Sequence, residues 1–393
     1  MTAPAPVRPV LPRYQTLDAW RGVACLMVIV YHSTMVYAGA PGAPADTGVT
    51  GALLWLASYG NLGVPLFFVL SGYCICAAAD RARRHDHPVR TYFVRRFRRI
   101  YPPLWAVIAA SLVFFLVVDY VVWPGLISTK PWQQPRPWWY SGWQWAGNLT
   151  LTETWRHYLG GGPRGHFPGQ AWTLCYEEQF YAITGLLLWL MPGRFFLGSI
   201  LVTLGCVVLL ALHTTLDVPV EGFFFDGNWF MFAAGIAVYY VLTYATARRA
   251  PAIAFLAGFG SLVWLLGDVR LGAAMTFAGL LLALHRFDSR LLALRAVAAL
   301  GWCGTMCYSL YLVHQLPVKA LSAALHAWGF QSGLATLAVV MPACVAVSLL
   351  LGRLFFTAVE SRFLNVPMPH SGSRRPMSEQ ATVPSDQTIT GLV

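Results

Sequence analysis

Apolar residues dominate the chain in long runs that short polar stretches separate. A helix needs about 20 mainly apolar residues to cross the hydrocarbon core of a bilayer. Ten runs approach that length, at residues 17–37, 52–79, 101–123, 172–191, 196–213, 223–245, 251–267, 271–285, 297–316 and 335–357. The pattern predicts an all-α polytopic membrane protein with about ten transmembrane helices. Runs 251–267 and 271–285 are short, and they could instead form one re-entrant hairpin.

The segments outside these runs predict a single membrane domain with two tails. We expect an N-terminal tail at residues 1–16, a membrane domain at 17–360, and a polar, proline-containing disordered tail at 361–393. The longest loop, 124–171, is rich in tryptophan. Such a loop can form an interfacial aromatic belt, or it can offer a stacking platform for a sugar or lipid acceptor. The belt is the preferred interpretation, because no polar cluster repeats beside the tryptophans.

Composition supports the membrane assignment and excludes other classes. The chain is 57% hydrophobic and 11% charged, whereas soluble domains carry about 25% charged residues. Its mean hydropathy is +0.56. These values exclude a soluble enzyme, a disordered protein and a fibrous protein. The eight cysteines all fall in apolar runs, so no disulfide framework is implied. No histidine or carboxylate joins Cys303 and Cys307 at metal-ligand spacing, and we expect no metal site.

The net charge of +11 raises the question of a nucleic-acid partner, and the position of the charges answers it. If the N-terminus is cytoplasmic, 21 of the 27 lysines and arginines fall in cytoplasmic segments. Positive residues favour the cytoplasmic side, so both termini are predicted to be cytoplasmic. We therefore expect membrane lipids, and not nucleic acid, as partners of the basic residues.

Ionisable residues inside the predicted helices are the first candidates for function, because a charge at the bilayer centre costs about 2.5–3.5 kcal/mol. Asp18, Arg21 and His32 belong to the first run. Eleven residues at about 100° each bring Arg21 and His32 to one face, roughly 16 Å apart along the axis. Asp18 lies one turn before Arg21 and can pair with it. A snorkelling arginine and a packed histidine are the ordinary alternative, but the shared face favours function.

A second set of ionisable residues precedes the third run. Arg96 and Arg99 are three residues apart in the basic segment 92–102, hence on one face if that segment is helical. Guanidinium groups suit phosphate. Such segments are equally typical of orientation signals and of anionic-lipid binding, so the segment alone leaves both interpretations open.

Two further stretches carry polar groups at membrane depth. Glu177 and Tyr181 are four residues apart at the start of run 172–191 and can face one site, whereas the adjacent Glu178 points elsewhere. His314 ends the stretch Tyr308–His314 and could simply lie among lipid headgroups. The stretch Gly63–Tyr73 is typical of close helix packing through small residues.

Together these stretches resemble the bacterial membrane acyltransferase family 3 across about residues 17–360. The resemblance depends on five motifs in the right order, since each alone is weak. They are Leu17-Asp18 through Arg21 with the Arg-x10-His spacing to His32, Phe67-Phe68-Val69-Leu70-Ser71-Gly72, Arg96-x-x-Arg99-Ile100 followed by Pro102, Trp172-x-Leu174-x-x-Glu177 with Phe180-Tyr181, and Tyr308-Ser309-Leu310-Tyr311-x-x-His314. Thr173 stands where the family often has serine, which keeps a hydroxyl, and Pro65 where an acid is frequent.

The resemblance implies an O-acyltransferase of the inner membrane that moves an acyl group, acetyl in the first instance, from acyl-CoA to a hydroxyl. The acceptor would be an envelope glycan, a lipid-linked sugar or an exported small molecule. Acyl-CoA would be a co-substrate, with no permanently bound cofactor. The competing class is a proton-coupled transporter or flippase, because intramembrane histidine, arginine and glutamate also build proton relays.

The resemblance also assigns roles to residues. His32 would take the acceptor proton or briefly carry the acyl group. Glu177 would orient His32 or hold the acceptor, and Arg21 would bind donor phosphate or stabilise an oxyanion. Arg96 and Arg99 would bind the phosphates of CoA. The other expected substrate-binding residues are Asp18, Ser71, Trp172, Tyr181 and His314.

Overall fold

The computed structural model describes residues 14–39, 46–85, 88–129, 135–160, 162–216, 219–244, 249–265 and 267–364. Throughout these ranges the regular elements are helices and no strand is present, which confirms the all-α prediction. Most of the expected tails, residues 1–13 and 365–393, lie outside the described residues. Residues 14–16 are held to the membrane domain, because the Gln15 and Thr16 amides donate to the Asp288 carboxylate at 2.6 and 3.0 Å.

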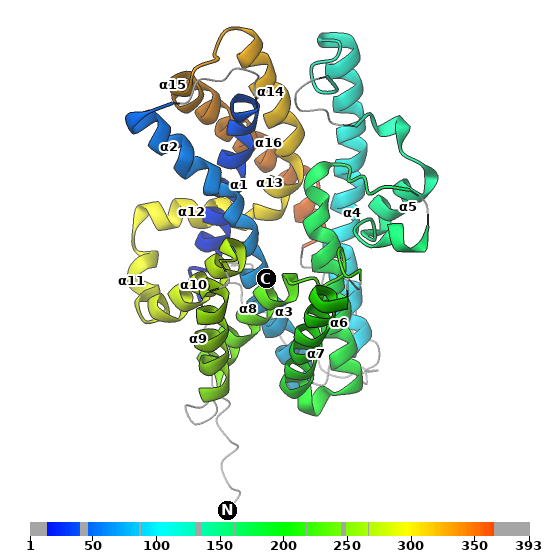
Figure 1. Cartoon of the computed structure of the whole chain (residues 1–393), viewed down its shortest axis with the longest axis vertical. Helices are drawn as coiled ribbons and strands as arrows, with labels where there is room; N and C mark the ends of the chain where they lie inside the picture. The colour runs from blue at the N-terminus through cyan, green and yellow to red at the C-terminus, as the bar shows by residue number, and fades with distance from the viewer. Residues whose placement is uncertain are drawn as a thin grey trace, which may run out of the picture.

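Most predicted runs correspond to single helices. In chain order the helices are α1 (Leu17–Ala38), α2 (Gly48–Ser58), α3 (Gly63–Arg84), α4 (Val89–Leu116), α5 (Gly142–Thr150), α6 (Trp172–Leu190), α7 (Phe195–Leu216), α8 (Asn228–Thr243), α9 (Ala250–Leu265), α10 (Val269–Leu284), α11 (Asp288–Leu292), α12 (Arg295–Thr305), α13 (Cys307–Val313), α14 (Gln315–Ala327), α15 (Gly333–Ala335) and α16 (Met341–Ala358). Figure 1 shows α4 to α7 on one side of the view and α9 to α12 on the other, with α1 and α3 between them.

Within the described residues, five helical stretches are long and apolar enough to cross a membrane, or six if the bent pair α12 and α13 counts as one span. They are Leu17–Ala38, Gly48–Arg84, Val89–Val122, Pro192–Leu216 and Gly333–Arg362. The helix α8 and residues 252–261 are apolar but shorter. The membrane character of the chain follows, whereas the count of ten spans and the cytoplasmic termini stay predictions.

The basic segment before the third run is helical. Helix α4 begins at Val89, twelve residues before the predicted start of that run, and continues through Pro102 and Pro103. Arg96 and Arg99 therefore lie on one helical face, as their spacing predicted for a helical segment.

The run at 297–316 differs from a single straight helix. Helices α12 and α13 meet at 63°, and the backbone at Met306 leaves the helical region with φ −112° and ψ 20°. Just before the break, Gly304 lies against α1 so closely that a Cβ there would be 1.6 Å from the Asp18 carbonyl oxygen. The bend starts a new helix direction at Cys307, and that helix supplies residues to the central cavity described below.

Small residues also bring α3 against α8. A Cβ on Gly72 would lie 2.0 Å from the Phe232 carbonyl oxygen, and one on Gly235 would lie 2.0 Å from that of Val69. The two backbones are thus in direct contact, which confirms the packing role predicted for the stretch Gly63–Tyr73. This contact fixes α3, which carries Ser71 and Cys74 to the molecular centre.

The long loop at 124–171 is folded through most of its length. A buried ion pair joins Arg156 Nε to Glu153 Oε2 at 2.6 Å, and Ser141 begins α5 with a reciprocal capping box. Three tryptophans of the loop, Trp138, Trp139 and Trp143, are exposed, as an interfacial belt requires. Trp132, which belonged to the same prediction, lies outside the described residues.

His166 in this loop makes the loop sensitive to acid. Burial, together with the charges of Arg164 and Arg156, lowers the pKa of His166 from 6.5 to about 4. The unfolded chain therefore binds more protons than the folded one between these values, and stability is lost as pH falls from about 6.5 toward 4. We expect the melting temperature of the His166→Gln variant to fall less over this interval than that of the parent chain. If the melting temperatures of the two proteins fall equally between pH 7.5 and pH 4.5, this assignment is contradicted.

Candidate functional site

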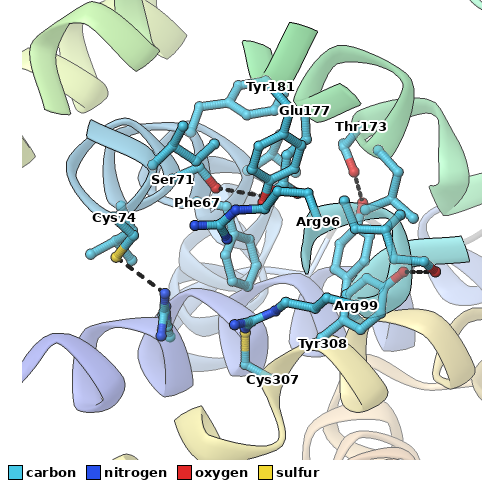
Figure 2. A pocket seen from close by; sticks show the side chains of 18 residues that line it. Phe67, Ser71, Cys74, Arg96, Arg99, Thr173, Glu177, Tyr181, Cys307 and Tyr308 are labelled. Carbon is cyan, nitrogen blue, oxygen red and sulfur yellow. Dashed lines mark hydrogen bonds between the residues drawn. The ribbon is translucent and has the colours of Figure 1, made fainter. Parts of the chain in front are cut away.

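A cavity of about 110 Å³ lies at the centre of the molecule, between α1, α3, α4, α6 and α13. We call it the arginine cavity, because three guanidinium groups line it. Its polar lining includes Arg21, Arg96, Arg99, Glu177, Ser71 and Tyr181. Figure 2 shows the side chains of Arg96 and Arg99 reaching into this space, with Ser71 and Glu177 joined on its far side. All five sequence motifs thus contribute residues to this cavity, the last of them through Tyr308 and Tyr311.

Arg21 is already paired in this arrangement. Its Nη1 atom donates to Asp18 Oδ1 at 2.9 Å, which confirms the predicted contact one turn apart. Its Nη2 atom donates to Cys74 Sγ at 3.1 Å. Asp18 therefore neutralises much of the charge of Arg21 and fixes its orientation toward the cavity.

Arg96 and Arg99 are held differently. The Arg96 guanidinium lies 5.1 Å from the ring centre of Tyr181 and 5.7 Å from that of Tyr92, distances at which a cation is attracted to an aromatic face. Over the described part of the chain, neither Arg96 nor Arg99 forms an ion pair within 4.0 Å. Among the described residues, the cavity therefore carries an excess of positive charge that no carboxylate pairs directly.

Glu177 is the acidic group that lines this cavity. Its Oε1 atom accepts hydrogen bonds from the Tyr181 hydroxyl at 2.8 Å and from the Ser71 hydroxyl at 3.3 Å. The predicted pairing of Glu177 with Tyr181 on one helix face is confirmed. Glu178 does not line the cavity. This was predicted, because adjacent residues of a helix point in different directions.

Two predicted residues of α6 have different surroundings. Thr173 lines the cavity, and its hydroxyl shares a hydrogen bond of 2.6 Å with that of Tyr311, so the hydroxyl retained at this position is used. Trp172 does not line the cavity. Its ring packs edge-on against Tyr176 at 5.9 Å between centroids, and its predicted substrate-binding role stays a prediction.

His32 lies outside the arginine cavity. It lines a second cavity of about 40 Å³ with Met35, Val36, Gln315 and Lys319, which we call the His32 cavity. The shared helix face of Arg21 and His32 therefore does not place them in one cavity. Glu177 lies in the arginine cavity, so the predicted role of Glu177 in orienting His32 has no direct contact to support it.

A row of rings lies between the two cavities. The rings of Phe67 and Tyr311, which both line the arginine cavity, are 5.7 Å apart between centroids. Tyr311 is in turn 5.7 Å from His314, and His314 is 5.2 Å from His32. We call Phe67, Tyr311 and His314 the aromatic row. Because of this row, Arg21 and His32 line different cavities although they share one face of α1.

His314 is fully buried, so the alternative that placed it among lipid headgroups is wrong. Its Nδ1 atom lies 2.9 Å from the Tyr311 carbonyl oxygen and 3.2 Å from that of Leu310. Carbonyl oxygens only accept, so Nδ1 carries the proton and Nε2 carries the lone pair of a neutral ring. Neither His314 Nε2 nor His32 Nδ1 has a hydrogen-bond partner among the described residues. The two rings are perpendicular, at 89°.

Several residues at the two cavities were not singled out by the sequence. Cys74 and Cys307 line the arginine cavity, although neither belongs to one of the five sequence motifs. Cys74 lies three residues after Ser71, and that spacing was the available signal. Lys319 lines the His32 cavity and belongs to none of the sequence motifs. Within the described ranges, no group of three or more histidine, cysteine or acidic residues is placed to hold a metal ion.

Comparison with known proteins gives a family and several partial relatives. A model of an acyltransferase domain family, acyltransferase family 3, matches residues 14–353. The O-acetyltransferase OatA of Staphylococcus aureus is 27% identical over 214 residues, which is 51% of this chain and 29% of that protein. The "Putative peptidoglycan O-acetyltransferase YrhL" of Bacillus subtilis is 31% identical over 105 residues, which is 26% of this chain and 14% of that protein. No solved structure matches.

The matched part spans less than a third of either relative. The family model covers the part of the chain in which both cavities lie. All five motifs fall inside the matched range of residues 14–353.

Proposed function

Because this chain belongs to acyltransferase family 3, and is therefore an enzyme that transfers acyl groups, we propose that it moves an acetyl group from acetyl-CoA to a hydroxyl of an envelope glycan or an exported small molecule. The observation that carries the proposal is the arginine cavity, where two guanidinium groups have no carboxylate partner in the described chain. Both relatives are named as O-acetyltransferases, YrhL as a putative one, which supports acetyl as the group transferred.

The donor would be held by its phosphates at Arg96 and Arg99. Burying a guanidinium charge without a partner costs free energy. A bound phosphate would offset this cost, because it accepts paired, charge-assisted hydrogen bonds from the guanidinium. Arg21, which is paired with Asp18 at 2.9 Å, would contact the donor in the same cavity. It would not contact the reacting carbonyl at His32, which lies about 16 Å away along α1.

The reacting carbonyl would then have to reach His32. Arg21 in the arginine cavity and His32 both lie on α1, about 16 Å apart along the helix axis. The pantetheine arm of CoA is long and flexible enough to run beside α1 over such a distance. The aromatic row stands in that path, so donor binding must move Phe67 or Tyr311.

At His32 the chemistry would be general base catalysis. His32 Nδ1 and His314 Nε2 have no hydrogen-bond partner among the described residues. A shift of the two rings on substrate binding would let His314 Nε2 accept a hydrogen bond from His32 Nδ1–H, which would leave the lone pair of His32 on Nε2. That nitrogen takes the proton of the acceptor hydroxyl as the oxygen attacks the thioester carbonyl. The C–O bond forms, the C–S bond breaks, and the departing thiolate receives the proton from His32. An acyl-histidine route would place the same Nε2 atom as nucleophile.

The proposal includes a membrane orientation. Both termini and the arginine cavity would face the cytoplasm of the inner membrane, where acyl-CoA is made, and the acceptor would approach from the opposite side. The distribution of lysine and arginine, 21 of 27 in the segments assigned to the cytoplasm, supports this orientation. Ten spans fit it, because an even number returns the chain to its starting side.

A transfer assay separates this function from the competing transporter. Purified protein would be incubated with radiolabelled acetyl-CoA and an extract of envelope glycans and small molecules. We expect free CoA to appear together with label on an acceptor. A transporter would release neither product, and that result, obtained with folded protein, would overturn the proposed function.

A further inference from the structure

A buried carboxylate holds the start of α13. Glu360 begins the short helical turn Glu360–Arg362 after α16, and only 2% of its surface is exposed. Its Oε2 atom accepts a hydrogen bond from the Ser309 amide at 3.0 Å and another from the Ser309 hydroxyl. Ser309 belongs to the last of the five motifs and is fully buried. Glu360 itself lies outside these motifs and outside the matched residues 14–353.

The contact lies where α13 needs an acceptor from another segment. The helix starts at Cys307, directly after the break at Met306, and Met306 makes no capping hydrogen bond with its side chain. The first amides of a helix have no acceptor within that helix, and Ser309 is the third residue of α13. A buried amide left without an acceptor is costly. Glu360, which is 51 residues further along the chain, therefore stabilises the new helix direction.

The direction of α13 matters because its residues reach both cavities. Tyr311 lines the arginine cavity, and His314, the residue after α13, packs against the ring of the proposed base at 5.2 Å. The far end of the helix has other contacts. The Tyr311 hydroxyl donates to the Gln170 carbonyl at 2.9 Å, and Gln170 Nε2 donates to the Leu312 carbonyl at 2.5 Å. Gln170 thus fixes the end of α13, and Glu360 fixes its start.

The charge of Glu360 also acts on the arginine cavity, although Glu360 does not line it. The charges of Arg99 and Arg21 interact with the Glu360 carboxylate. Among the described residues, no ion pair within 4.0 Å joins Glu360 to either arginine. A neutral residue at position 360 would therefore leave the cavity more positive. Such a change would not weaken the binding of phosphate at Arg99.

We propose that Glu360 is a positioning residue of the transfer reaction. Through Ser309 it holds α13 in the direction that places Tyr311 and His314 between the two cavities. Glu360 touches neither the donor nor the acceptor, so its loss lowers turnover and does not weaken donor binding. The effect on turnover rests on the proposed function, whereas the hold on α13 is a property of the fold and can be measured separately.

Two substitutions at position 360 test the effect on turnover. The purified full chain is given radiolabelled acetyl-CoA and the extract of envelope glycans and small molecules, and the release of CoA is followed. We expect Glu360→Ala to lower kcat about tenfold to a hundredfold, the effect of losing hydrogen bonds to a charged acceptor, without raising the KM for acetyl-CoA. Glu360→Gln keeps an oxygen that can accept from Ser309 and should retain more of the kcat. Parental kcat in Glu360→Ala, or equal losses in the two variants, would overturn the inference.

Asp288 provides a matched control for lost stability. Its carboxylate is 8% exposed and also accepts from the amide and the hydroxyl of one residue, Thr16, at 3.0 and 2.7 Å. Asp288 lines neither cavity. Asp288→Ala should therefore lower the melting temperature as Glu360→Ala does, but leave kcat unchanged. A similar loss of kcat in both variants would show that Glu360 contributes only to stability, and the inference would be wrong.

Hydrogen–deuterium exchange tests the hold on α13 without any reaction. We expect the peptide that covers residues 307–314 to exchange about tenfold faster in Glu360→Ala than in the parent chain. The change should be smaller in Glu360→Gln and absent in Asp288→Ala. If the parent chain releases no CoA but this difference is found, the proposed function fails and the placement of α13 by Glu360 stands. Unchanged exchange in Glu360→Ala would overturn the inference even where kcat falls.

Discussion

Replacing His32 with alanine is expected to lower the rate of acetyl transfer by about 10²–10⁴-fold, the range typical of a lost general acid–base group. The imidazole lines the smaller cavity and is backed by His314 at 5.2 Å. Alanine provides no proton acceptor at this position. CoA release and acceptor labelling under saturating acetyl-CoA measure the effect.

Two further variants make this result interpretable. His32→Gln fills more of the space than alanine and should be equally inactive, because an amide nitrogen cannot act as the base. His314→Gln keeps a carbonyl acceptor near His32 Nδ1 and should retain more activity than His314→Leu, with the loss in kcat and not in KM. Full activity of folded His32→Ala would remove the proposed base, and equal rates for the two His314 variants would remove the role of His314 Nε2.

The second large effect is expected at Arg99. Its guanidinium lines the arginine cavity and has no ion pair among the described residues. A hydrogen bond to a charged group contributes about 1.5–3 kcal/mol, so Arg99→Met should raise the KM for acetyl-CoA about tenfold to a hundredfold. Arg99→Lys should give a smaller rise, because a point charge replaces a planar fork. Initial rates over a range of acetyl-CoA concentrations measure both.

Arg98 provides the matched control for this prediction. It belongs to the same basic segment of α4 but does not line the cavity. Arg98→Met should leave the KM for acetyl-CoA unchanged. Similar donor kinetics for the parent chain, Arg98→Met and Arg99→Met would return the whole segment to its alternative interpretation as an orientation or lipid-binding signal.

Features that depend on local periodicity could be predicted from the sequence. Helix α6 spans Trp172–Leu190, close to the predicted run 172–191, because a continuous apolar stretch specifies its own helix length. The pairs Asp18 with Arg21 and Glu177 with Tyr181 follow from spacings of three and four residues. The family resemblance is confirmed for the same reason, since its motifs are short and local.

Features that depend on packing between distant segments could not be predicted. The break at Met306 arises where Gly304 contacts the backbone of α1. The local sequence around residue 306 does not indicate which distant helix lies against it. The break sets the direction of α13, which carries Tyr311, and the following His314 buries its ring beside His32. Helical spacing correctly placed Arg21 and His32 on one face, but it could not reveal that other rings divide the space in front of that face.

The account as a whole requires one donor molecule to connect the two cavities. The most direct test is a cryo-electron microscopy structure of the protein bound to a non-hydrolysable acetyl-CoA analogue in which a methylene replaces the thioester sulfur. We predict phosphate density within hydrogen-bond distance of Arg96 and Arg99, displaced rings at Phe67 or Tyr311, and the acetyl carbonyl within contact of His32. Phosphates bound away from these arginines, or an acetyl group that stays in the arginine cavity with the aromatic row closed over His32, would contradict the account.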